Sequence, residues 1–343
     1  MARFLVVAPS WVGDAVLSQP LLTLLKQAQP DAAIDVLGPR WALPVYRRMP
    51  EVAETIESPF GHGQLALGAR WRLGRTLGTR GYERCYVLPN SFKSALVPAL
   101  ARIPRRIGYV GEARQLLLTE ARRLDKHALP LMVERFAALA LPAATCLPQP
   151  LPRPRLRFDA AQREALLSRL GLVTQAPVAC FCPGAEFGPA KRWPEAHFAA
   201  LAARLHDQGW QVWLVGSAKE RDLGEEIRRA SGGRATNLCG ATSLDEAILL
   251  LSRADVVVSN DSGLMHVAAA LERPLVALYG SSSPGFTPPL ADGARILSLR
   301  LECSPCFQRV CPLGHFNCMM QLDPGRVHSE IVQLAGRSHP GNP

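Results

Sequence analysis

The chain alternates between short apolar runs and longer segments with helical periodicity. Residues 4–8 read Phe-Leu-Val-Val-Ala, an Ala- and Leu-rich segment covers about 15–28, and the same succession repeats as far as residue 101. Short β-branched runs are typical of buried parallel strands, whereas the longer periodic segments are typical of helices. Further strands are expected at residues 33–37, 55–56, 82–88 and 107–109, and further helices at 40–49, at 65–79 and in a segment that ends near 101.

Prolines then interrupt this pattern. They are Pro142, Pro148, Pro150, Pro152 and Pro154. A proline-rich segment is stiff and extended, which is typical of a linker. Because 343 residues are too many for one small domain, we expect an N-terminal domain at 1–154, with the linker at about 142–154, and a C-terminal domain at 155–343.

The alternation restarts after the linker. Strands are expected at residues 178–182, 211–215, 254–259 and 274–279, and helices at 195–208, 219–230, 244–252 and after Gly263. Strands that alternate with helices predict parallel sheets covered by helices on both faces. The expected fold class is therefore α/β, with two doubly wound domains whose ligand-binding edges lie at the carboxyl ends of the strands. The pattern leaves open whether the last helix packs back on the N-terminal domain.

Polar turns follow four of the expected strands, at residues 9–14, 88–94, 183–194 and 260–266. In the last of these, Asp261 and Ser262 precede a helix. They are either N-caps or part of an anion site, because a helix N-terminus offers unpaired N–H groups and a positive dipole. Asp14 also has two interpretations: it is either an N-cap or a general base.

The turn at 183–194 is rich in glycine and proline and carries Lys191 and Arg192. A cation in this position could neutralise a diphosphate leaving group. The turn is not a P-loop, because the Gly-x-x-x-x-Gly-Lys-Ser/Thr spacing is absent. After the next strand, Glu220 or Asp222 could accept hydrogen bonds from ribose hydroxyls.

A net charge of +10 favours polyanionic partners. Basic residues gather between residues 102 and 126, namely Arg102, Arg105, Arg106, Arg114, Arg122, Arg123 and Lys126. The alternative is a solvated basic face. We expect no nucleic-acid partner, since no binding motif is present and the aromatic content is only 6%. No apolar run is long enough to span a bilayer and the N-terminus lacks signal-peptide features, so we expect a cytosolic protein.

Nine cysteines in a reduced compartment do not indicate a disulfide framework. Cys180 and Cys182 lie in an expected strand and are interpreted as core residues. A different group has the spacing C-x2-C-x4-C-x6-C and is accompanied by His315; its members are Cys303, Cys306, Cys311 and Cys318. This group could form a structural zinc site or consist of reduced packing thiols, and a disulfide is the third alternative.

Taken in order, the four polar turns resemble those of the ADP-heptose:lipopolysaccharide heptosyltransferases, glycosyltransferase family 9. The resemblance runs from Phe4 to about Pro289. It implies a GT-B fold, in which two Rossmann-like domains face a cleft, with the acceptor mostly on the first domain and the nucleotide-sugar on the second. It also implies an inverting transfer from ADP-L-glycero-D-manno-heptose that requires no metal or other cofactor.

The resemblance also assigns roles to residues. Asp14 would take the proton of the acceptor hydroxyl, Lys191 would hold the diphosphate, and Asp261 would hold heptose or ribose hydroxyls. The donor-binding candidates are Gly184, Glu186, Lys191, Glu220, Asp222, Asp261, Ser262, Gly263, Leu264 and His266. The acceptor-binding candidates are Ser10, Trp11, Gly13, Asn90, Ser91, Lys93, Arg105 and Arg106, with Arg122 expected nearby.

Residues 11–14 and 90–94 are closest to the family members that add the second heptose of the lipopolysaccharide inner core. The expected partners are therefore heptosyl-Kdo2-lipid A, ADP-heptose and the anionic cytoplasmic face of the inner membrane, where the enzyme would be peripheral. Enzymes that add the first or a third heptose are alternatives. A non-catalytic nucleotide- or polyanion-binding protein is the alternative from another class.

Overall fold

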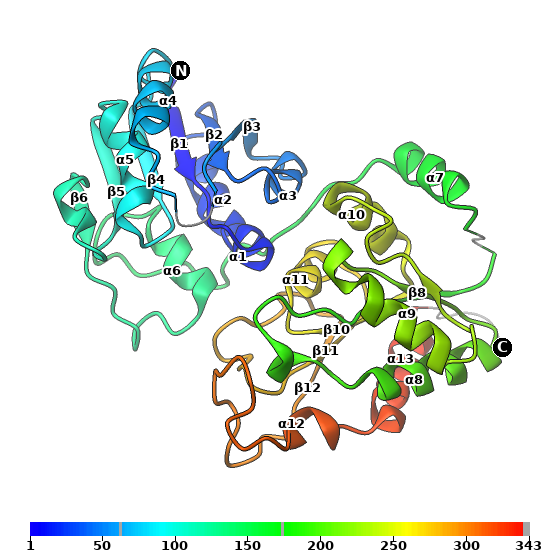
Figure 1. The fold of residues 1–343 in the computed structure, drawn as a ribbon. Helices are drawn as coiled ribbons and strands as arrows, with labels where there is room; N and C mark the ends of the chain where they lie inside the picture. Colours follow the sequence, from blue (N-terminus) through cyan, green and yellow to red (C-terminus); the bar gives the residue numbers. More distant parts are fainter. Residues whose placement is uncertain (62–63, 173–174, 339–343) are drawn as a thin grey trace. The chain divides into compact units, whose positions relative to one another are not determined.

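The computed structural model describes residues 1–61, 64–172 and 175–338 (Figure 1). The chain divides into two compact units, Met1–Leu156 and Arg157–Pro343, close to the boundary expected at residue 154. Each unit is an α/β structure built on one six-stranded parallel sheet. The expected pair of Rossmann-like domains is thereby confirmed.

The sheet of the first unit has the order β3-β2-β1-β4-β5-β6, and its strands pair in parallel. The strands are β1 Arg3–Val7, β2 Ala33–Gly38, β3 Val52–Glu57, β4 Arg84–Val87, β5 Arg105–Tyr109 and β6 Glu120–Arg122. The helices are α1 Val12–Leu17, α2 Gln19–Ala28, α3 Leu43–Arg47, α4 Leu67–Gly78, α5 Phe92–Leu100 and α6 Met132–Ala138, with a 3-10 turn η1 at Arg114–Leu116.

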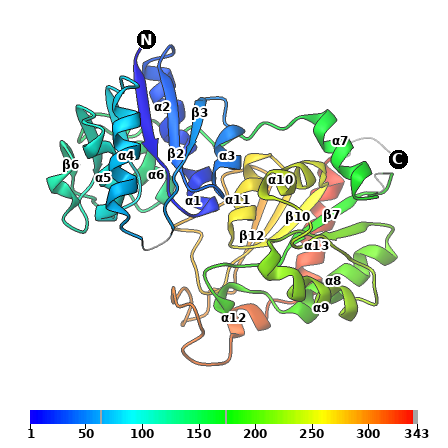
Figure 2. The same ribbon diagram turned by 45° about the horizontal axis from the view of Figure 1, so that its top comes forward.

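Helices cover both faces of this sheet (Figure 2). Side chains alternate along a strand, so Leu5 and Val87 face the core under α4 and α5, while the ring of Phe4 packs edge-on against Tyr86. One expectation is corrected. The helix predicted at 15–28 is two helices, which meet at Ser18, whose hydroxyl bonds to the carbonyl of Ala15 (2.7 Å).

The sheet of the second unit has the order β12-β11-β10-β7-β8-β9 and is also parallel. Its strands are β7 Val178–Cys182, β8 Gln211–Leu214, β9 Thr236–Asn237, β10 Val256–Asn260, β11 Leu275–Leu278 and β12 Ala294–Leu297. Its helices are α7 Ala160–Arg169, α8 Glu195–Asp207, α9 Arg221–Ala230, α10 Leu244–Arg253, α11 Gly263–Ala270, α12 Asn317–Met320 and α13 Pro324–Ser338, with 3-10 turns η2 at Pro189–Lys191 and η3 at Ala218–Glu220.

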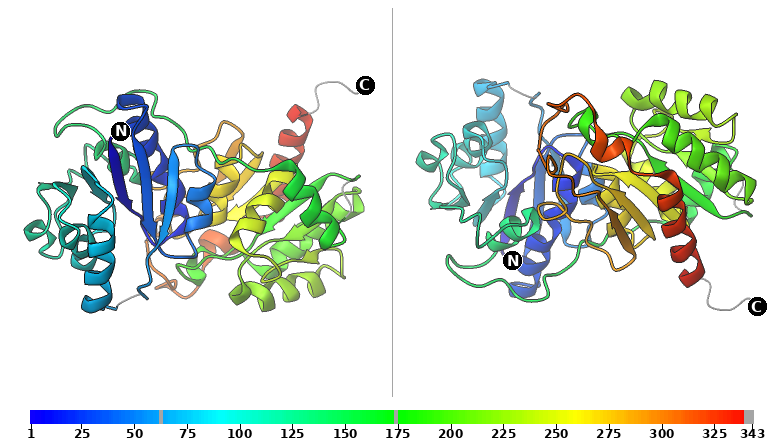
Figure 3. Two further views of the ribbon diagram at one scale, coloured as in Figure 1. Left: turned by 90° about the horizontal axis from the view of Figure 1, so that it is seen from above. Right: turned by 90° about the horizontal axis from the view of Figure 1, so that it is seen from below.

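The helices α8, α9 and α13 cover one face of the second sheet, and α10 and α11 cover the other (Figure 3). Trp193 and Phe198 stack edge-on in the core on the α8 side, with ring centroids 4.8 Å apart. Cys180 and Cys182 are buried in β7, which confirms their interpretation as core residues. Burial raises the pKa of both thiols, so they stay protonated and unreactive.

Both sheets reverse their strand order at one place, between β1 and β4 in the first unit and between β7 and β10 in the second. In open α/β sheets the crevice at the carboxyl ends of the strands at such a switch point is where ligands bind. The four polar turns follow β1, β4, β7 and β10. Each unit therefore carries two of them at its switch point. Among the described residues no helix combines the length and the hydropathy that a membrane span requires.

Candidate functional site

A partly buried ion pair lies at the switch point of the second unit, directly before α11. The Nζ atom of Lys191 is 2.5 Å from Oδ2 of Asp261, whose residue is only 5% exposed. Ser262 occupies the N-cap position of α11 but makes no side-chain capping bond. The N-cap interpretation of Asp261 is therefore wrong. The carboxylate is instead stabilised by the lysine and by the positive end of the helix dipole.

The loop that carries Lys191 is fastened to β10 by one side chain, the amide of Asn260. Its Nδ2 donates to the carbonyl of Pro183 (2.7 Å), and its Oδ1 accepts from the backbone N–H of Trp193 (3.0 Å). Asn260 is fully buried. Both ends of the loop are thus held by one residue that the sequence analysis did not include among the site candidates. The available signal was two polar residues, Ser259 and Asn260, at the end of an otherwise apolar strand.

The middle of the same loop rests on the segment that carries the cysteine cluster. The N–H of Ala190 donates to the carbonyl of Arg309 (3.0 Å). A Cβ at Gly188 would lie 2.4 Å from that carbonyl oxygen, so the close approach requires glycine. Two cations also lie near the Phe187 ring. The Nζ of Lys191 is 5.1 Å from the ring centroid, and the guanidinium carbon of Arg309 is 5.3 Å from it. These contacts restrict where the Lys191 ammonium can lie.

His266 lies one turn into α11 and is buried. Burial lowers its pKa to about 4, and the nearby Lys191 charge acts in the same direction against the opposing effect of Asp261. The imidazole is therefore neutral near pH 7. It can exchange hydrogen bonds within the site, but it brings no positive charge to a bound anion.

Of the two acidic residues expected to hold ribose, the structure brings only Glu220 to the switch-point turns. A Cβ on Gly184 would lie 1.6 Å from Glu220 Oε1, so the carboxylate occupies the space that this glycine leaves open. The other oxygen of Glu220 accepts from the Ser217 N–H (2.6 Å). Asp222 is exposed on α9 and lines a separate open pocket with Asn237. Glu186 is exposed and pairs with Lys219 (2.6 Å).

In the first unit, Asp14 is the third residue of α1 and is half-buried. The N-cap position belongs to Trp11, whose backbone is extended, so the N-cap interpretation of Asp14 is wrong. Burial raises the pKa of Tyr46 well above its usual range, and the charge of Asp14 adds to this rise. Gly13 lies in the first turn of α1, and Ser10, whose carbonyl accepts from the Trp41 indole (2.9 Å), is exposed beside it.

The turn after β4 is supported from the core of the unit by a fully buried arginine, Arg114. Its guanidinium donates to the carbonyls of Tyr109 and Pro89 and to Oδ1 of Asn90 (2.9 Å). Burial lowers the pKa of Arg114 to about 10, which still leaves it charged. Contrary to the expectation from the sequence, Arg114 is therefore not part of a polyanion-binding surface; it supports the turn after β4 from the core. Ser91 and Lys93 lie at the start of α5.

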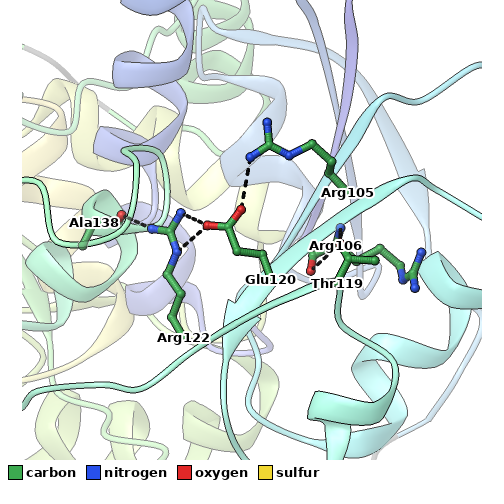
Figure 4. Close-up of polar contacts among 6 residues, drawn as sticks. All are labelled: Arg105, Arg106, Thr119, Glu120, Arg122 and Ala138. Carbon is green, nitrogen blue, oxygen red and sulfur yellow. Dashed lines mark hydrogen bonds and ion pairs between the residues drawn. The ribbon is translucent and has the colours of Figure 1, made fainter.

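Three further arginines of the cluster, Arg105 and Arg106 on β5 and Arg122 on β6, do not gather at one point (Figure 4). Arg105 and Arg122 converge on Glu120, the former at 3.1 Å. The Arg106 guanidinium points away from them and donates to the carbonyls of Leu117 (2.6 Å) and Ile103 (2.5 Å). Consecutive strand residues point to opposite sides, so the structure does not bring Arg105 and Arg106 together.

With this geometry in place, comparison with known proteins identifies the family. Residues 70–317, more than half of the chain, match the family described as glycosyltransferase family 9 (heptosyltransferase). The chain belongs to glycosyltransferase family 9. It is therefore a glycosyltransferase, and its two Rossmann-like units are those of the GT-B fold.

Individual relatives cover nearly the whole of this glycosyltransferase. It is 48% identical to lipopolysaccharide heptosyltransferase 2 of Salmonella typhimurium, over 97% of this chain and 98% of that protein. It is 30% identical to lipopolysaccharide heptosyltransferase 1 of Pseudomonas aeruginosa, over 97% and 98%. The solved structure of the E. coli ADP-heptose lps heptosyltransferase II superimposes with a TM-score of 0.88 at 45% identity, over 98% of this chain and 99% of that one.

The cysteine cluster of this glycosyltransferase surrounds one small cavity of about 20 Å³. Its lining includes Cys303, Cys306, Cys311, Cys318 and His315. Backbone N–H groups of the following turn, that of Phe316 foremost, lower the pKa of the Cys311 thiol. Within the described parts of the chain no group of three or more His, Cys, Asp or Glu side chains is arranged to hold a metal ion. The four residues are free cysteines, and the zinc site stays a prediction.

Proposed function

We propose that this glycosyltransferase moves L-glycero-D-manno-heptose from ADP-heptose to the first heptose of the lipopolysaccharide inner core. The observation that carries the substrate assignment is its 48% identity to a heptosyltransferase 2 over nearly the full length of both chains. Relatives named heptosyltransferase 1 and heptosyltransferase 3 are only 30% and 25% identical. Transfer to the second position of the core is therefore favoured over the two alternative acceptors.

The Lys191–Asp261 pair supports the donor part of this proposal. Departure of ADP leaves negative charge on the diphosphate, which requires cationic and N–H partners that are already in place. The Lys191 ammonium and the N–H groups of Ser262, Gly263 and Leu264 provide them at the N-terminus of α11. Asp261 holds the lysine near that terminus and is available to heptose or ribose hydroxyls, and Glu220 is the remaining candidate for ribose.

Asp14 is the proposed general base. The acceptor hydroxyl oxygen forms a bond to the anomeric carbon from the face opposite ADP, its proton passes to the Asp14 carboxylate, and the bond to the diphosphate oxygen breaks. Attack from the opposite face inverts the configuration. In this scheme Lys191 and the N-terminus of α11 stabilise the charge of the leaving diphosphate, which is the task of the metal ion in metal-dependent enzymes. We therefore expect transfer to proceed in the presence of a chelator.

The acceptor of the proposed reaction is anchored in lipid. We therefore propose that the enzyme acts peripherally on the anionic cytoplasmic face of the inner membrane. A zinc ion in the cysteine cluster would be structural, because the cluster lies outside the proposed chemistry. Metal analysis of the purified protein tests this point, and less than about a tenth of an equivalent of zinc or iron would exclude a filled four-thiolate site.

ADP release from ADP-heptose tests the proposed reaction. The two acceptors are Kdo2-lipid A and the same molecule carrying one heptose. We expect release only with the heptosylated acceptor. Release with unmodified Kdo2-lipid A would reassign the enzyme to the first heptose, and release with neither would refute the proposed acceptor and donor pair.

The variant Asp14→Asn separates an enzyme from a non-catalytic binder. The amide keeps the size of the side chain but cannot take the proton, so turnover should fall by about 10²–10⁴-fold. Binding of ADP, measured by calorimetry, should be unchanged because the proposed donor residues belong to the other unit. A variant with undiminished turnover would remove Asp14 from the role of base.

A further inference from the structure

Every charged residue between β3 and Glu83 is an arginine. Between Glu57 and Glu83 the chain contains no acidic residue, whereas it contains Arg70, Arg72, Arg75 and Arg80. Arg80 is engaged by Glu54 (2.7 Å). The other three arginines lie on α4 and give this helix a positive charge that no side chain of the helix balances.

The outward face of α4 and the chain just before this helix also carry large apolar side chains. Leu65, Leu67 and Trp71 are 46%, 55% and 50% exposed. Leu67, Trp71 and Arg75 follow one another at intervals of four residues, which places them along one stripe of the helix. The Arg75 guanidinium lies 5.0 Å from the Trp71 ring centroid, and Arg72 is exposed beside them. We call Leu65, Leu67, Trp71, Arg72 and Arg75 the α4 face.

The opposite side of α4 packs against the rest of the first unit. A Cβ on Gly74 would lie 2.7 Å from Cβ of Leu100, so α4 packs closely on α5, its neighbour in Figure 2. The buried Arg70 donates to the carbonyls of Leu65 (2.7 Å) and Lys93 (2.9 Å). The buried side of α4 is therefore held against the start of α5, where the acceptor candidate Lys93 lies.

We propose that the α4 face is the surface by which the protein binds an anionic lipid bilayer. The inference rests on the proposed function, in which the acceptor is a lipid. An exposed tryptophan with leucines suits the interfacial region of a membrane, and arginines on a helix that has no acidic residue of its own suit anionic headgroups. Because α4 is anchored by Arg70 to the start of α5, where Lys93 lies, docking through α4 would bring this part of the first unit to the plane in which the acceptor lies.

Vesicle co-sedimentation of the full chain tests the proposal without turnover. The vesicles are phosphatidylcholine alone and phosphatidylcholine mixed with phosphatidylglycerol. We expect binding to the anionic vesicles only, and at least about tenfold weaker partitioning for Arg72→Glu/Arg75→Glu, since each basic residue near the surface strengthens binding about fivefold. Trp71→Ser should weaken binding, whereas Trp71→Phe should largely retain it.

Matched controls make the same changes elsewhere. Arg229→Glu on α9 with Arg326→Glu on α13 matches the double charge reversal, and Val332→Ser on α13 matches Trp71→Ser, because all three residues are exposed and belong to the second unit. Both controls should bind anionic vesicles like the unmodified protein. Equal losses in the controls and in the α4 variants, or no loss in the α4 variants, would overturn the proposal. Binding of ADP by every variant confirms that it is folded.

The lipid proposal and the proposed function can fail separately. With a delipidated, heptosylated core oligosaccharide as acceptor, the α4 variants should release ADP at the unmodified rate, while KM for the vesicle-embedded acceptor should rise. Vesicle binding through α4 without ADP release from any acceptor would refute the function and retain the docking surface. Normal turnover with unchanged KM in vesicles would refute the docking surface and retain the function.

Discussion

At the scale of single residues, Arg105 and Arg106 have different tasks although they are adjacent (Figure 4). Arg106 is half-buried and satisfies two backbone carbonyls. Arg106→Gln should therefore lower the free energy of unfolding by about 1–3 kcal/mol. Arg105 has a side chain that is 53% exposed, so Arg105→Gln should change stability by less than about 1 kcal/mol and instead raise KM for the acceptor.

Urea unfolding and acceptor titrations measure these two effects, with KM for ADP-heptose as the internal control. Of these two arginines, only Arg105 remains a candidate for contact with the acceptor. An Arg106→Gln protein with full stability and a raised acceptor KM would contradict this division.

His266 provides a second residue-level prediction, through pH. Its folded-state pKa of about 4 lies below the ordinary value of about 6.5. Between these values the unfolded chain binds the proton and the folded protein does not, so the free energy of unfolding falls as the pH falls. From pH 7 to pH 5 this residue should account for about 2 kcal/mol of the loss.

The comparison protein is His266→Gln, which has no ionisable group at this position and should lack this part of the pH dependence. Denaturant unfolding at several pH values between 7 and 5 provides the measurement. Identical slopes for the two proteins would show that His266 is not buried in its neutral form.

At the scale of elements, Asn260 couples the end of β10 to both ends of the loop that carries Lys191. Asn260→Asp keeps the acceptor for the Trp193 N–H but loses the donor to Pro183. We expect stability to fall by about 1–3 kcal/mol, with a lower kcat and a higher KM for ADP-heptose because the position of Lys191 is no longer fixed.

Asn237 is a matched control for this prediction. It ends β9 and also makes one donated and one accepted bond to the backbone, to Arg221 (3.0 Å) and from Cys239 (3.1 Å). Asn237→Asp should lower stability comparably while leaving kcat unchanged. Parallel effects of the two variants on kcat would reduce Asn260 to a general structural residue.

At the scale of the whole molecule, each unit has its own sheet and its own core. A protein of this construction is expected to unfold in more than one step. ADP should stabilise only the step that belongs to the second unit, by about 2.7 kcal/mol at a hundredfold excess over Kd. Differential scanning calorimetry measures this selectivity, and Lys191→Met should diminish the shift. An equal shift of all transitions would mean that ADP does not bind to the second unit alone.

The sequence by itself determined the fold class, most element positions and the four polar turns. These features depend on local periodicity and on turn residues, both of which can be recognised within a short stretch of sequence. It also identified Lys191 and Asp261 individually. It did not indicate that they form an ion pair, because 70 residues separate them.

Tertiary structure alone decided the rest of the site. Each sheet's strand order places two polar turns at one switch point, and this order depends on pairing between distant segments. Only the structure shows that Arg114 is a core residue and not a surface cation. It also shows that neither Asp14 nor Asp261 is an N-cap. Side-chain direction, burial and long-range partners follow from packing, which no short stretch of sequence specifies.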